Sequence, residues 1–386
     1  MAKDRKGMLS HVRRVVVKIG SNVLASSRIT LDEGVVERIS ADLSTVMDAG
    51  YKVVLVTSGA ILAGRAKLGL RERPRLVCQK QAVAAVGQST LMRTYEKHME
   101  QFGKRVAQLL LTDGDMTHRQ RYINARNTLE TLFSYGVLPV VNENDTVAVE
   151  EIKFGDNDTL SAVVSQLVEA DLLIILSDVD GLYTADPNQD TDARFIPVVE
   201  SIDKEILSLA GETPSIVGIG GMITKIQAAQ TAAQSGTTTV IVNGRIPGVI
   251  SRILQGEELG TLFLPKEDTL NCKRCWIAFR LKPRGTITVD EGAFKALTVS
   301  KKSLLPSGII GVSGNFDSGE SVSILSPDGK EFARGLVNYN ASEIKRIKGV
   351  RSKLIDQILG YCTAEEVVHR DNLAILEGSA LSREDT

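Results

Sequence analysis

The chain has few cysteines, histidines and aromatic residues, and each shortage excludes a class of site. Four cysteines in 386 residues cannot form a disulfide framework. The one C-x-x-C, Cys272 to Cys275, has no second cysteine pair or histidine partner nearby, so a zinc site is not expected. The four histidines, at positions 11, 98, 118 and 369, show no metal-ligand spacing. Nine Phe, seven Tyr and one Trp argue against a surface that binds nucleic acid by base stacking.

Long apolar segments are also missing. Residues 1–11 are polar and contain no apolar core of signal-peptide length. Apolar runs such as Leu172–Leu176 fall far short of the ~20 residues that cross a bilayer. From these absences we expect a soluble protein of the reducing cytoplasm that makes no membrane contact.

Neither sign of charge dominates the chain. The sequence has 46 Lys plus Arg and 47 Asp plus Glu, a formal net charge of -1. Residues 271–386 hold 17 basic and 14 acidic side chains, a balance of +3, which leaves -4 for the remainder. This balance argues against bulk nucleic-acid binding. Apolar and charged fractions of 43% and 24% are those of a globular protein, so wholesale disorder is excluded.

Short apolar segments alternate with amphipathic ones from Val15 to about Leu264. The apolar segments are nearly continuous in Val, Ile and Leu, which is typical of strands buried on both faces. This alternation predicts an α/β fold, a three-layer αβα sandwich around a mainly parallel sheet. The predicted strands are Val15–Ile19, Lys52–Val56, Val106–Leu111, Leu138–Val141, Leu172–Leu176 and Thr238–Val242.

Helix boundaries can be predicted at three places. Thr30 and Glu33 have the spacing of a capping box, followed by an apolar stripe that ends before Gly50. A second helix is expected to end near Gly136, and a third to run from Asp158 towards Val168.

The pattern changes after Leu264. Residues 265–276 are polar and interrupted, and turn signals such as Pro283-Arg284-Gly285, Ser313-Gly314-Asn315 and Pro327-Asp328-Gly329 follow. We therefore predict a small β-rich second domain. The predicted organisation is an N-terminal extension (1–11), the α/β domain (12–264), a linker (265–276) and the β-rich domain with its tail (277–386).

Polar and glycine-rich clusters follow four of the predicted strands. Any one of them could be ordinary turn chemistry. Parallel α/β sheets, however, bind ligands beyond the carboxyl ends of their strands, and Lys, Asn and Asp gather only at this end. The clusters are Lys18-Ile19-Gly20-Ser21-Asn22, Thr57-Ser58-Gly59-Ala60, Asn142-Glu143-Asn144-Asp145 and Ser177-Asp178-Val179-Asp180-Gly181.

Two lysines beside glycines point to phosphate binding. Lys18 precedes Gly20 at the end of a strand, and Lys225 follows the glycine-rich segment 218–221 at the start of a helix. Lys18 alone could be an ordinary lysine at a strand end whose ammonium group extends to solvent. The sequence contains no Gly-Lys-Ser/Thr, and the spacing fails the G-x-G-x-x-G fingerprint. A phosphate site with lysines from two distant segments is the remaining interpretation.

These clusters, in this order, resemble the amino-acid kinase family, and within it the branch that phosphorylates glutamate. The resemblance covers nearly all of residues 12–264. Residues from about 277 to 351 resemble a PUA domain, supported by A-R-G-L-V-N-Y at 333–339 and E-V-V-H-R-D-N-L at 366–373. The catalytic-domain motifs are V-V-V-K-I-G-S at 15–21, V-T-S-G-A-I at 56–61, N-E-N-D at 142–145, F-G-D-N-D-T-L-S-A at 154–162, S-D-V-D-G-L-Y-T-A-D-P at 177–187 and G-G-M-I-T-K at 220–225.

The resemblance implies a reaction and a set of partners. The reaction is transfer of the γ-phosphoryl group of ATP, with Mg²⁺, to the side-chain carboxylate of L-glutamate. The product, L-glutamyl 5-phosphate, opens proline biosynthesis. The resemblance also implies feedback inhibition by proline, assembly into a dimer or tetramer, and a glutamyl phosphate reductase as downstream partner.

The resemblance also implies which residues are catalytic, which bind the substrate and which bind the nucleotide. It assigns no residue to a metal. Ile219 stands where the family often has Thr, which leaves one nucleotide contact in question. The expected catalytic residues are Lys18, Lys225 and Asp158, with Asp158 orienting the two lysines. The expected substrate-binding residues are Ser58, Gly59, Asn142, Asp145, Asp156 and Asn157. The expected nucleotide-binding residues are Lys18, Gly20, Ser177, Asp178, Ile219, Gly220, Gly221, Met222, Ile223, Thr224 and Lys225.

Three alternatives stay open at this point. The first is a kinase of the same fold that acts on N-acetylglutamate, aspartate, carbamate or a nucleoside monophosphate. Asp145 favours a substrate with a free α-amino group, because it supplies a counter-ion. The second is RNA binding by the PUA-like domain, for which a balance of +3 is a weak electrostatic footprint. The third is a regulator that binds glutamate or proline without turnover, against which the lysine pair argues.

Overall fold

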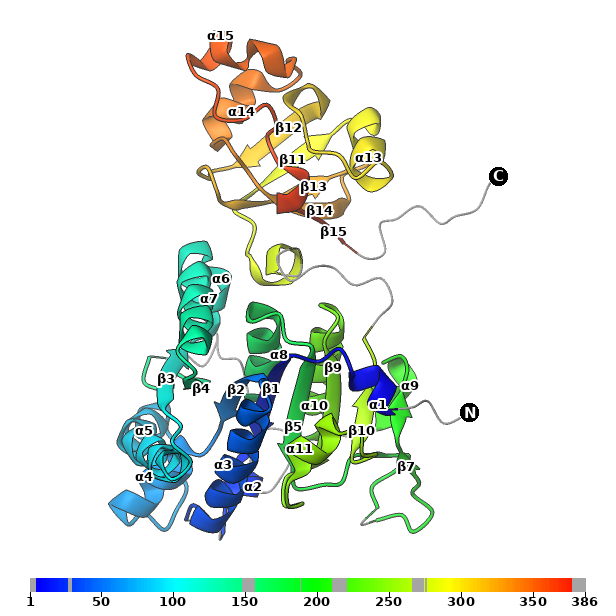
Figure 1. Ribbon diagram of the computed structural model, residues 1–386. Helices are drawn as coiled ribbons and strands as arrows, with labels where there is room; N and C mark the ends of the chain where they lie inside the picture. The colour runs from blue at the N-terminus through cyan, green and yellow to red at the C-terminus, as the bar shows by residue number, and fades with distance from the viewer. Residues whose placement is uncertain are drawn as a thin grey trace. The chain divides into compact units, whose positions relative to one another are not determined.

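The chain forms two compact units in a computed structural model (Figure 1). The first comprises Met1–Met116 with Gln120–Thr269, and the second Thr117–Arg119 with Leu270–Thr386. The structure describes residues 5–26, 30–147, 157–187, 189–209, 221–265, 274 and 276–376.

An eight-stranded sheet lies at the centre of the first unit, and its strand order is β3-β4-β2-β1-β5-β9-β10-β8. All pairs are parallel except β9 with β10. The six predicted strands are confirmed, with ends shifted by two residues at most. The bounds are β1 Arg14–Ile19, β2 Lys52–Thr57, β3 Val106–Leu111, β4 Leu138–Glu143, β5 Leu172–Ser177, β8 Val198–Val199, β9 Thr238–Asn243 and β10 Thr261–Phe263.

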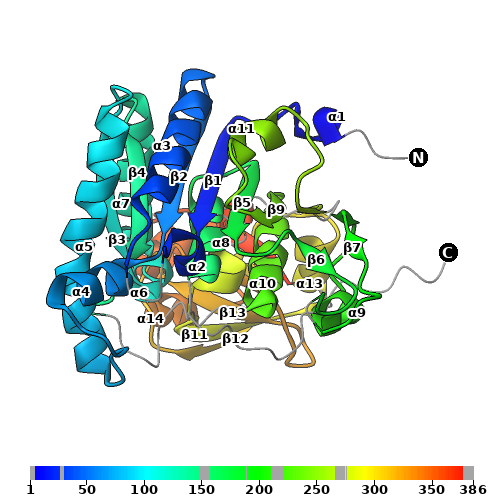
Figure 2. The same ribbon diagram turned by 90° about the horizontal axis from the view of Figure 1, so that it is seen from below.

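Helices cover both faces of this sheet, as the alternating pattern predicts. Helices α3 (Glu33–Asp48) and α11 (Val249–Leu254) pack together on one side of the strands, and α5 (Val77–Glu100) packs against α3. Helices α8 (Asn157–Leu167) and α10 (Met222–Ala233) pack together on the other side (Figure 2). The first unit is therefore a three-layer αβα sandwich.

Shorter elements complete the part of the first unit that the structure describes. A two-stranded antiparallel ribbon, β6 (Leu182–Tyr183) with β7 (Phe195–Ile196), follows β5. The remaining helices are α1 Arg5–Leu9, α2 Ser21–Leu24, α4 Ala60–Leu68, α6 Asp113–Thr117, α7 Arg119–Ser134 and α9 Lys204–Leu209.

The predicted helix ends are confirmed, but one predicted start is wrong. Helix α3 begins after Asp32, whose carboxylate accepts the N–H of Val35 at 3.1 Å, so Asp32 and not Thr30 caps the helix. An aspartate is the better cap, because its negative charge also suits the positive end of the helix dipole. Gly50 (φ 89°) follows α3, and Gly136 (φ 65°) follows α7, both in the left-handed conformation that ends helices.

Alternation along β1 decides which face Lys18 occupies. Val15, Val17 and Ile19 pack in a core cluster with side chains of α3 and α11. Successive side chains of a strand point to opposite faces, so Lys18 lies on the face that α8 and α10 cover.

Helices α4 and α5 approach each other closely through two glycines. A Cβ atom on Gly87 would lie 1.8 Å from the carbonyl oxygen of Ala60, and one on Gly64 would lie 1.9 Å from that of Val83. No side chain fits at these distances. The contact holds α5 against the start of α4, directly after Ser58 and Gly59.

The second unit contains a five-stranded sheet in the order β12-β11-β13-β14-β15. Only β11 and β13 pair in parallel. A separate core that includes Phe316, Phe332 and Tyr339 lies within this unit. The predicted β-rich character is confirmed. The bounds are β11 Gly285–Val289, β12 Ile309–Gly314, β13 Ser321–Leu325, β14 Glu331–Leu336, β15 Leu373–Ile375, α13 Glu291–Thr298, α14 Ala341–Ile347 and α15 Ile355–Leu359, with shorter helical turns at η2 Trp276–Arg280, η3 Pro306–Gly308, η4 Ser352–Leu354 and η5 Arg370–Asn372.

Among the residues that the structure describes, no helix combines the length and the apolarity needed to cross a membrane.

The α4–α5 contact yields a stability prediction. We expect Gly87→Ala to lower the free energy of unfolding by roughly 1–3 kcal/mol, because the added methyl group overpacks the contact. The matched control is Gly114→Ala in α6, where the nearest atom would lie 3.6 Å from the new Cβ. Its effect should stay within about 0.5 kcal/mol. Urea denaturation measures both, and equal midpoints for the two variants would contradict the close contact.

Candidate active site

The carboxyl ends of the central strands gather most of the predicted site residues. The strand order reverses direction at β1, which pairs with β2 on one side and with β5 on the other. Such a reversal opens a crevice at the ends of the strands. The predicted clusters at Lys18, Ser58, Asn142 and Ser177 all lie at this end, because each one closes or follows β1, β2, β4 or β5.

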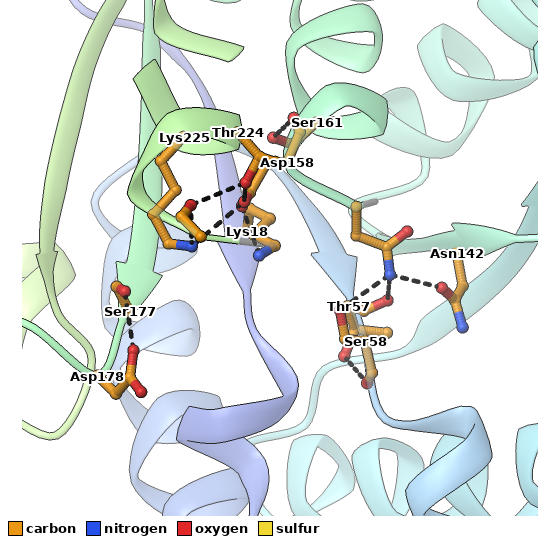
Figure 3. A network of polar contacts seen from close by, with 12 residues as sticks. Lys18, Thr57, Ser58, Asn142, Asp158, Ser161, Ser177, Asp178, Thr224 and Lys225 are labelled. Carbon is orange, nitrogen blue, oxygen red and sulfur yellow. Dashed lines mark hydrogen bonds and ion pairs between the residues drawn. The ribbon is translucent and has the colours of Figure 1, made fainter. Parts of the chain in front are cut away.

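A buried ion cluster occupies the face of β1 that α8 and α10 cover (Figure 3). Lys18 Nζ lies 2.5 Å from Asp158 Oδ1, and Lys225 Nζ lies 3.3 Å from Asp158 Oδ2. Thr224 Oγ1 donates to the same Oδ2 at 2.8 Å. Asp158 has no exposed surface, while Lys18 and Lys225 are 5% and 8% exposed. Three elements distant in the sequence therefore meet at one carboxylate.

The charges in this cluster explain the ionisation of Asp158. Burial by itself would raise the pKa of the carboxyl group, but Lys18 and Lys225, with hydrogen bonds from Lys18 and Thr224, outweigh burial and hold that pKa below its ordinary value. The carboxylate thus stays charged at neutral pH. Two lysines around one carboxylate leave one positive charge in excess, which suits an anionic ligand.

Glycines leave room beside both lysines. A Cβ atom on Gly20 would lie 3.5 Å from Lys18 Nζ, so this predicted position borders the ammonium group. Gly221 caps α10 in an extended conformation (φ -101°), and its carbonyl accepts from Thr224 and Lys225. Met222, Ile223, Thr224 and Lys225 form the first turn of that helix. The N–H groups of a first turn have no partner within the helix and can hold phosphate oxygens.

Amide groups form a second cluster, close to the ends of β2 and β4. Asn157 Nδ2 donates to Thr57 O at 2.9 Å, to Ser58 Oγ at 2.9 Å and to Asn142 Oδ1 at 3.0 Å. Figure 3 shows Thr57, Ser58 and Asn142 on the side of the site away from Ser177. Ser58 and Asn142, predicted from separate segments, are brought together by Asn157. Gly59 (φ 107°) turns the chain into α4.

A third group lies at the end of β5. Ser177 Oγ donates to Asp178 Oδ1 at 3.2 Å, and Asn22 Nδ2 donates to Asp178 Oδ2 at 2.8 Å. Asn243 Nδ2 holds Asp180 Oδ1 at 2.8 Å. These bonds orient two exposed carboxylates beyond the carboxyl end of β5.

The remaining predicted site residues are Asp145, Asp156, Ile219 and Gly220. Asp145 lies in the turn after β4 and is partly exposed. Asp156, Ile219 and Gly220 lie outside the described residues, as do Cys272 and Cys275. Among the residues that are described, no three His, Cys, Asp or Glu side chains come together as a metal cage.

Sequence analysis missed four side chains that support the site. Asn22 stood within a predicted cluster but received no role, and Asn243 ends β9. Gln88 and Tyr95 lie inside α5 and carry no motif. Tyr95 is fully buried, and its hydroxyl lies 2.8 Å from Thr57 Oγ1. Burial raises the pKa of this phenol, so it stays neutral.

Comparison with known proteins settles the family. Residues 13–243 match the model of the amino acid kinase family, and residues 285–359 match that of the PUA domain. The chain belongs to the amino acid kinase family. The predicted family and the predicted PUA domain are both confirmed.

Three curated relatives match this chain over nearly its full length. A glutamate 5-kinase from Geobacter sulfurreducens is 51% identical over 372 residues, which cover 96% of this chain and 100% of that protein. A glutamate 5-kinase from Pelobacter propionicus is 50% identical with the same coverage. A glutamate 5-kinase from Caldanaerobacter subterraneus is 50% identical over 94% of this chain and 98% of its own length.

The ion cluster predicts how Asp158→Asn changes stability with pH. A carboxyl group whose pKa is lowered on folding stabilises the protein above its unfolded pKa, and this contribution is lost as the pH falls through the folded pKa. At pH 7 we expect the variant to lose about 3 kcal/mol, because two lysines stay buried without their counter-ion. The loss should begin to shrink below the ordinary pKa of 3.8, where the unfolded wild-type chain takes up a proton that the folded protein does not yet bind.

Urea denaturation between pH 3 and pH 7 measures this difference. The matched control is Asp48→Asn, which removes the more exposed pair of Asp48 with Lys104. That variant should lose less than about 1 kcal/mol at every pH. A gap between Asp158→Asn and wild type that is independent of pH would contradict the assigned ionisation.

Proposed function

We propose that this chain is a glutamate 5-kinase, an ATP-dependent enzyme that phosphorylates the side-chain carboxylate of L-glutamate to L-glutamyl 5-phosphate. The observation that carries the proposal is the pair of lysines held on one buried carboxylate at the carboxyl ends of the strands. The full-length similarity to glutamate 5-kinases supports the same substrate. The product places the enzyme at the first step of proline biosynthesis.

Phosphoryl transfer to a carboxylate requires positive charge in the active site and requires no general base. A side-chain carboxylate is ionised at pH 7 and already nucleophilic. The obstacle is the approach of two anions and the charge that spreads over the transferring phosphoryl oxygens. Lys18 and Lys225 bring two ammonium groups to this region, and desolvation strengthens their effect. Because both oxygens of Asp158 are engaged by the lysines, Asp158 orients them and takes no proton from the substrate.

ATP and Mg²⁺ fit the residues present. The first turn of α10, the Gly20 region and Asp178 at the end of β5 are the groups we assign to the nucleotide. A magnesium ion in a kinase site keeps several waters and is held largely by substrate phosphates, so the exposed carboxylates of Asp178 and Asp180 fit it without a protein cage. When bound, the ion neutralises charge on the phosphates.

The amide cluster is assigned to the amino acid. Ser58, Asn142 and Asn157, with Asp145 nearby in the sequence, offer polar groups, and Asn157 directly precedes the carboxylate that binds the lysines. Asp145 supplies a counter-ion for a free α-ammonium group, which an N-acetylated substrate lacks. This arrangement favours glutamate over N-acetylglutamate.

Regulation and assembly are further parts of the proposal. Inhibition by proline, a dimer or tetramer, and delivery of the product to a glutamyl phosphate reductase follow from the family resemblance. A cytoplasmic location fits the free thiols of Cys78 and Cys362. A proline titration of the activity tests the inhibition, and light scattering of the purified chain tests the oligomeric state.

The lysine pair predicts a large loss of turnover on substitution. We expect Lys18→Ala and Lys225→Ala each to lower kcat by at least roughly a hundredfold, because each removes a preorganised positive charge. The matched control is Lys67→Ala on the exposed side of α4, which should leave kcat unchanged. A coupled ADP-release assay measures all three. Wild-type turnover in either of the first two variants would contradict the assignment.

A substrate panel tests the reaction itself. With ATP and hydroxylamine present, L-glutamate should give a hydroxamate, because the product is an acyl phosphate that hydroxylamine traps. N-acetyl-L-glutamate and L-aspartate should give at least about tenfold less at equal concentration. No hydroxamate from glutamate would exclude the proposed function, and a stronger signal from another acid would reassign the substrate.

A further inference from the structure

Two backbone groups determine how the amides of the second cluster are oriented. Asn157 faces the carbonyl oxygen of Thr57 at 2.9 Å. A carbonyl can only accept, so the facing atom of Asn157 is Nδ2. Asn142 faces the N–H of Glu143 at 2.9 Å. This group can only donate, so the facing atom of Asn142 is Oδ1.

The orientation of Asn142 in turn decides that of Gln88. Asn142 Nδ2 lies 3.0 Å from the side-chain amide of Gln88 on α5. Because Nδ2 donates, Gln88 must present Oε1 to it, and Nε2 then points away from Asn142. Gly87, the neighbouring residue, holds this part of α5 against Ala60. The position of Gln88 relative to Ser58 is therefore set by backbone packing.

Once these hydrogen bonds are assigned, one donor atom and one acceptor atom of the cluster have no partner. Gln88 Nε2 and Asn157 Oδ1 are buried and make no hydrogen bond within the described structure. Buried polar atoms are nearly always paired, and an unpaired one calls for a ligand or water that completes it. The two residues themselves are partly exposed, and both amides are hydrogen-bonded to Asn142 at the end of β4.

A free amino acid has the complementary pair of groups. Its α-carboxylate accepts hydrogen bonds, and its α-ammonium group donates them. The side-chain carboxylate must reach the lysines around Asp158, which adjoins Asn157 in the sequence. The main-chain end of the substrate is then left for the amides.

We propose that Gln88 is a specificity-determining residue of the amino-acid site, with Nε2 donating to the α-carboxylate of the substrate while Asn157 Oδ1 accepts from its α-ammonium group. This inference rests on the proposed function and extends it to a residue inside α5 that no motif marks. Discrimination of glutamate from acids without an α-carboxylate then depends on one amide group.

The test is Gln88→Glu assayed at pH 8, where a carboxyl group is ionised. The new side chain still accepts from Asn142 Nδ2, but it replaces the free donor by an oxygen. We expect KM for glutamate to rise at least about tenfold, the scale of a lost hydrogen bond to a charged group. KM for ATP should stay within about twofold. The matched control is Gln101→Glu at the exposed end of α5, which should leave both constants unchanged.

Two truncated ligands separate recognition from a structural effect. Glutarate keeps both carboxylates and lacks the ammonium group, whereas 4-aminobutyrate lacks the α-carboxylate. As competitive inhibitors against glutamate, glutarate should bind the variant at least about tenfold more weakly than wild type. The inhibition constant of 4-aminobutyrate should not rise. If Gln88 acted only by holding Asn142, a contact that Gln88→Glu keeps, neither inhibitor would weaken, and the inference would be overturned.

The outcomes also distinguish the inference from the function on which it rests. If wild type gives no hydroxamate from glutamate, the proposed function fails and the inference fails with it. If wild type is active and Gln88→Glu keeps its KM for glutamate, the inference alone fails. Should Gln88→Glu not fold, Gln88→Met decides by the same comparison of glutarate with 4-aminobutyrate.

Discussion

The site is organised around a single buried carboxylate that binds two lysines. Asp158 is fully buried, and each of its oxygens is matched by an ammonium group from a different element. Removal of the carboxylate, or of the ammonium groups, would leave a buried charge without its partner in a region of low dielectric, which lowers the stability of the fold. The carboxylate therefore ties β1, α8 and α10 to one another. The same contact that stabilises the packing of these elements also brings two positive charges together at one carboxylate, so stability and charge placement cannot be separated here.

Much of this arrangement is predictable, because local patterns carry it. The six main strands are continuous apolar segments, and such segments are buried whatever surrounds them. Lys18 is the last residue but one of such a strand, so alternation alone sends it to the face opposite Val17 and Ile19. Where the local rule was ambiguous, prediction failed. Thr30 and Asp32 both stand near the start of α3, and the spacing to Glu33 favoured Thr30, whereas the carboxylate of Asp32 makes the cap.

The residues that sequence analysis missed share a physical cause. Gln88 and Tyr95 lie in the middle of α5, where the pattern predicts only a helix. Their roles come from β2 and β4, whose residues Thr57 and Asn142 lie far from them in the chain. The approach that creates these contacts depends on Gly64 and Gly87, and a glycine within a helix does not by itself identify its partner. Long-range packing of this kind cannot be derived from periodicity.

The position of Asn157 beside Asp158 joins the two halves of the site. At the start of a helix, neighbouring side chains diverge, so one residue can face the amides of β2 and β4 while the next faces the lysines. A ligand that spans both halves needs an anionic group at one end and a polar group with donors and acceptors at the other. The spacing between these ends then depends on two adjacent residues at the start of α8. In the proposed function, an acid of different length would place its carboxylate off the lysines, so the start of α8 would contribute to substrate choice as well as to charge placement.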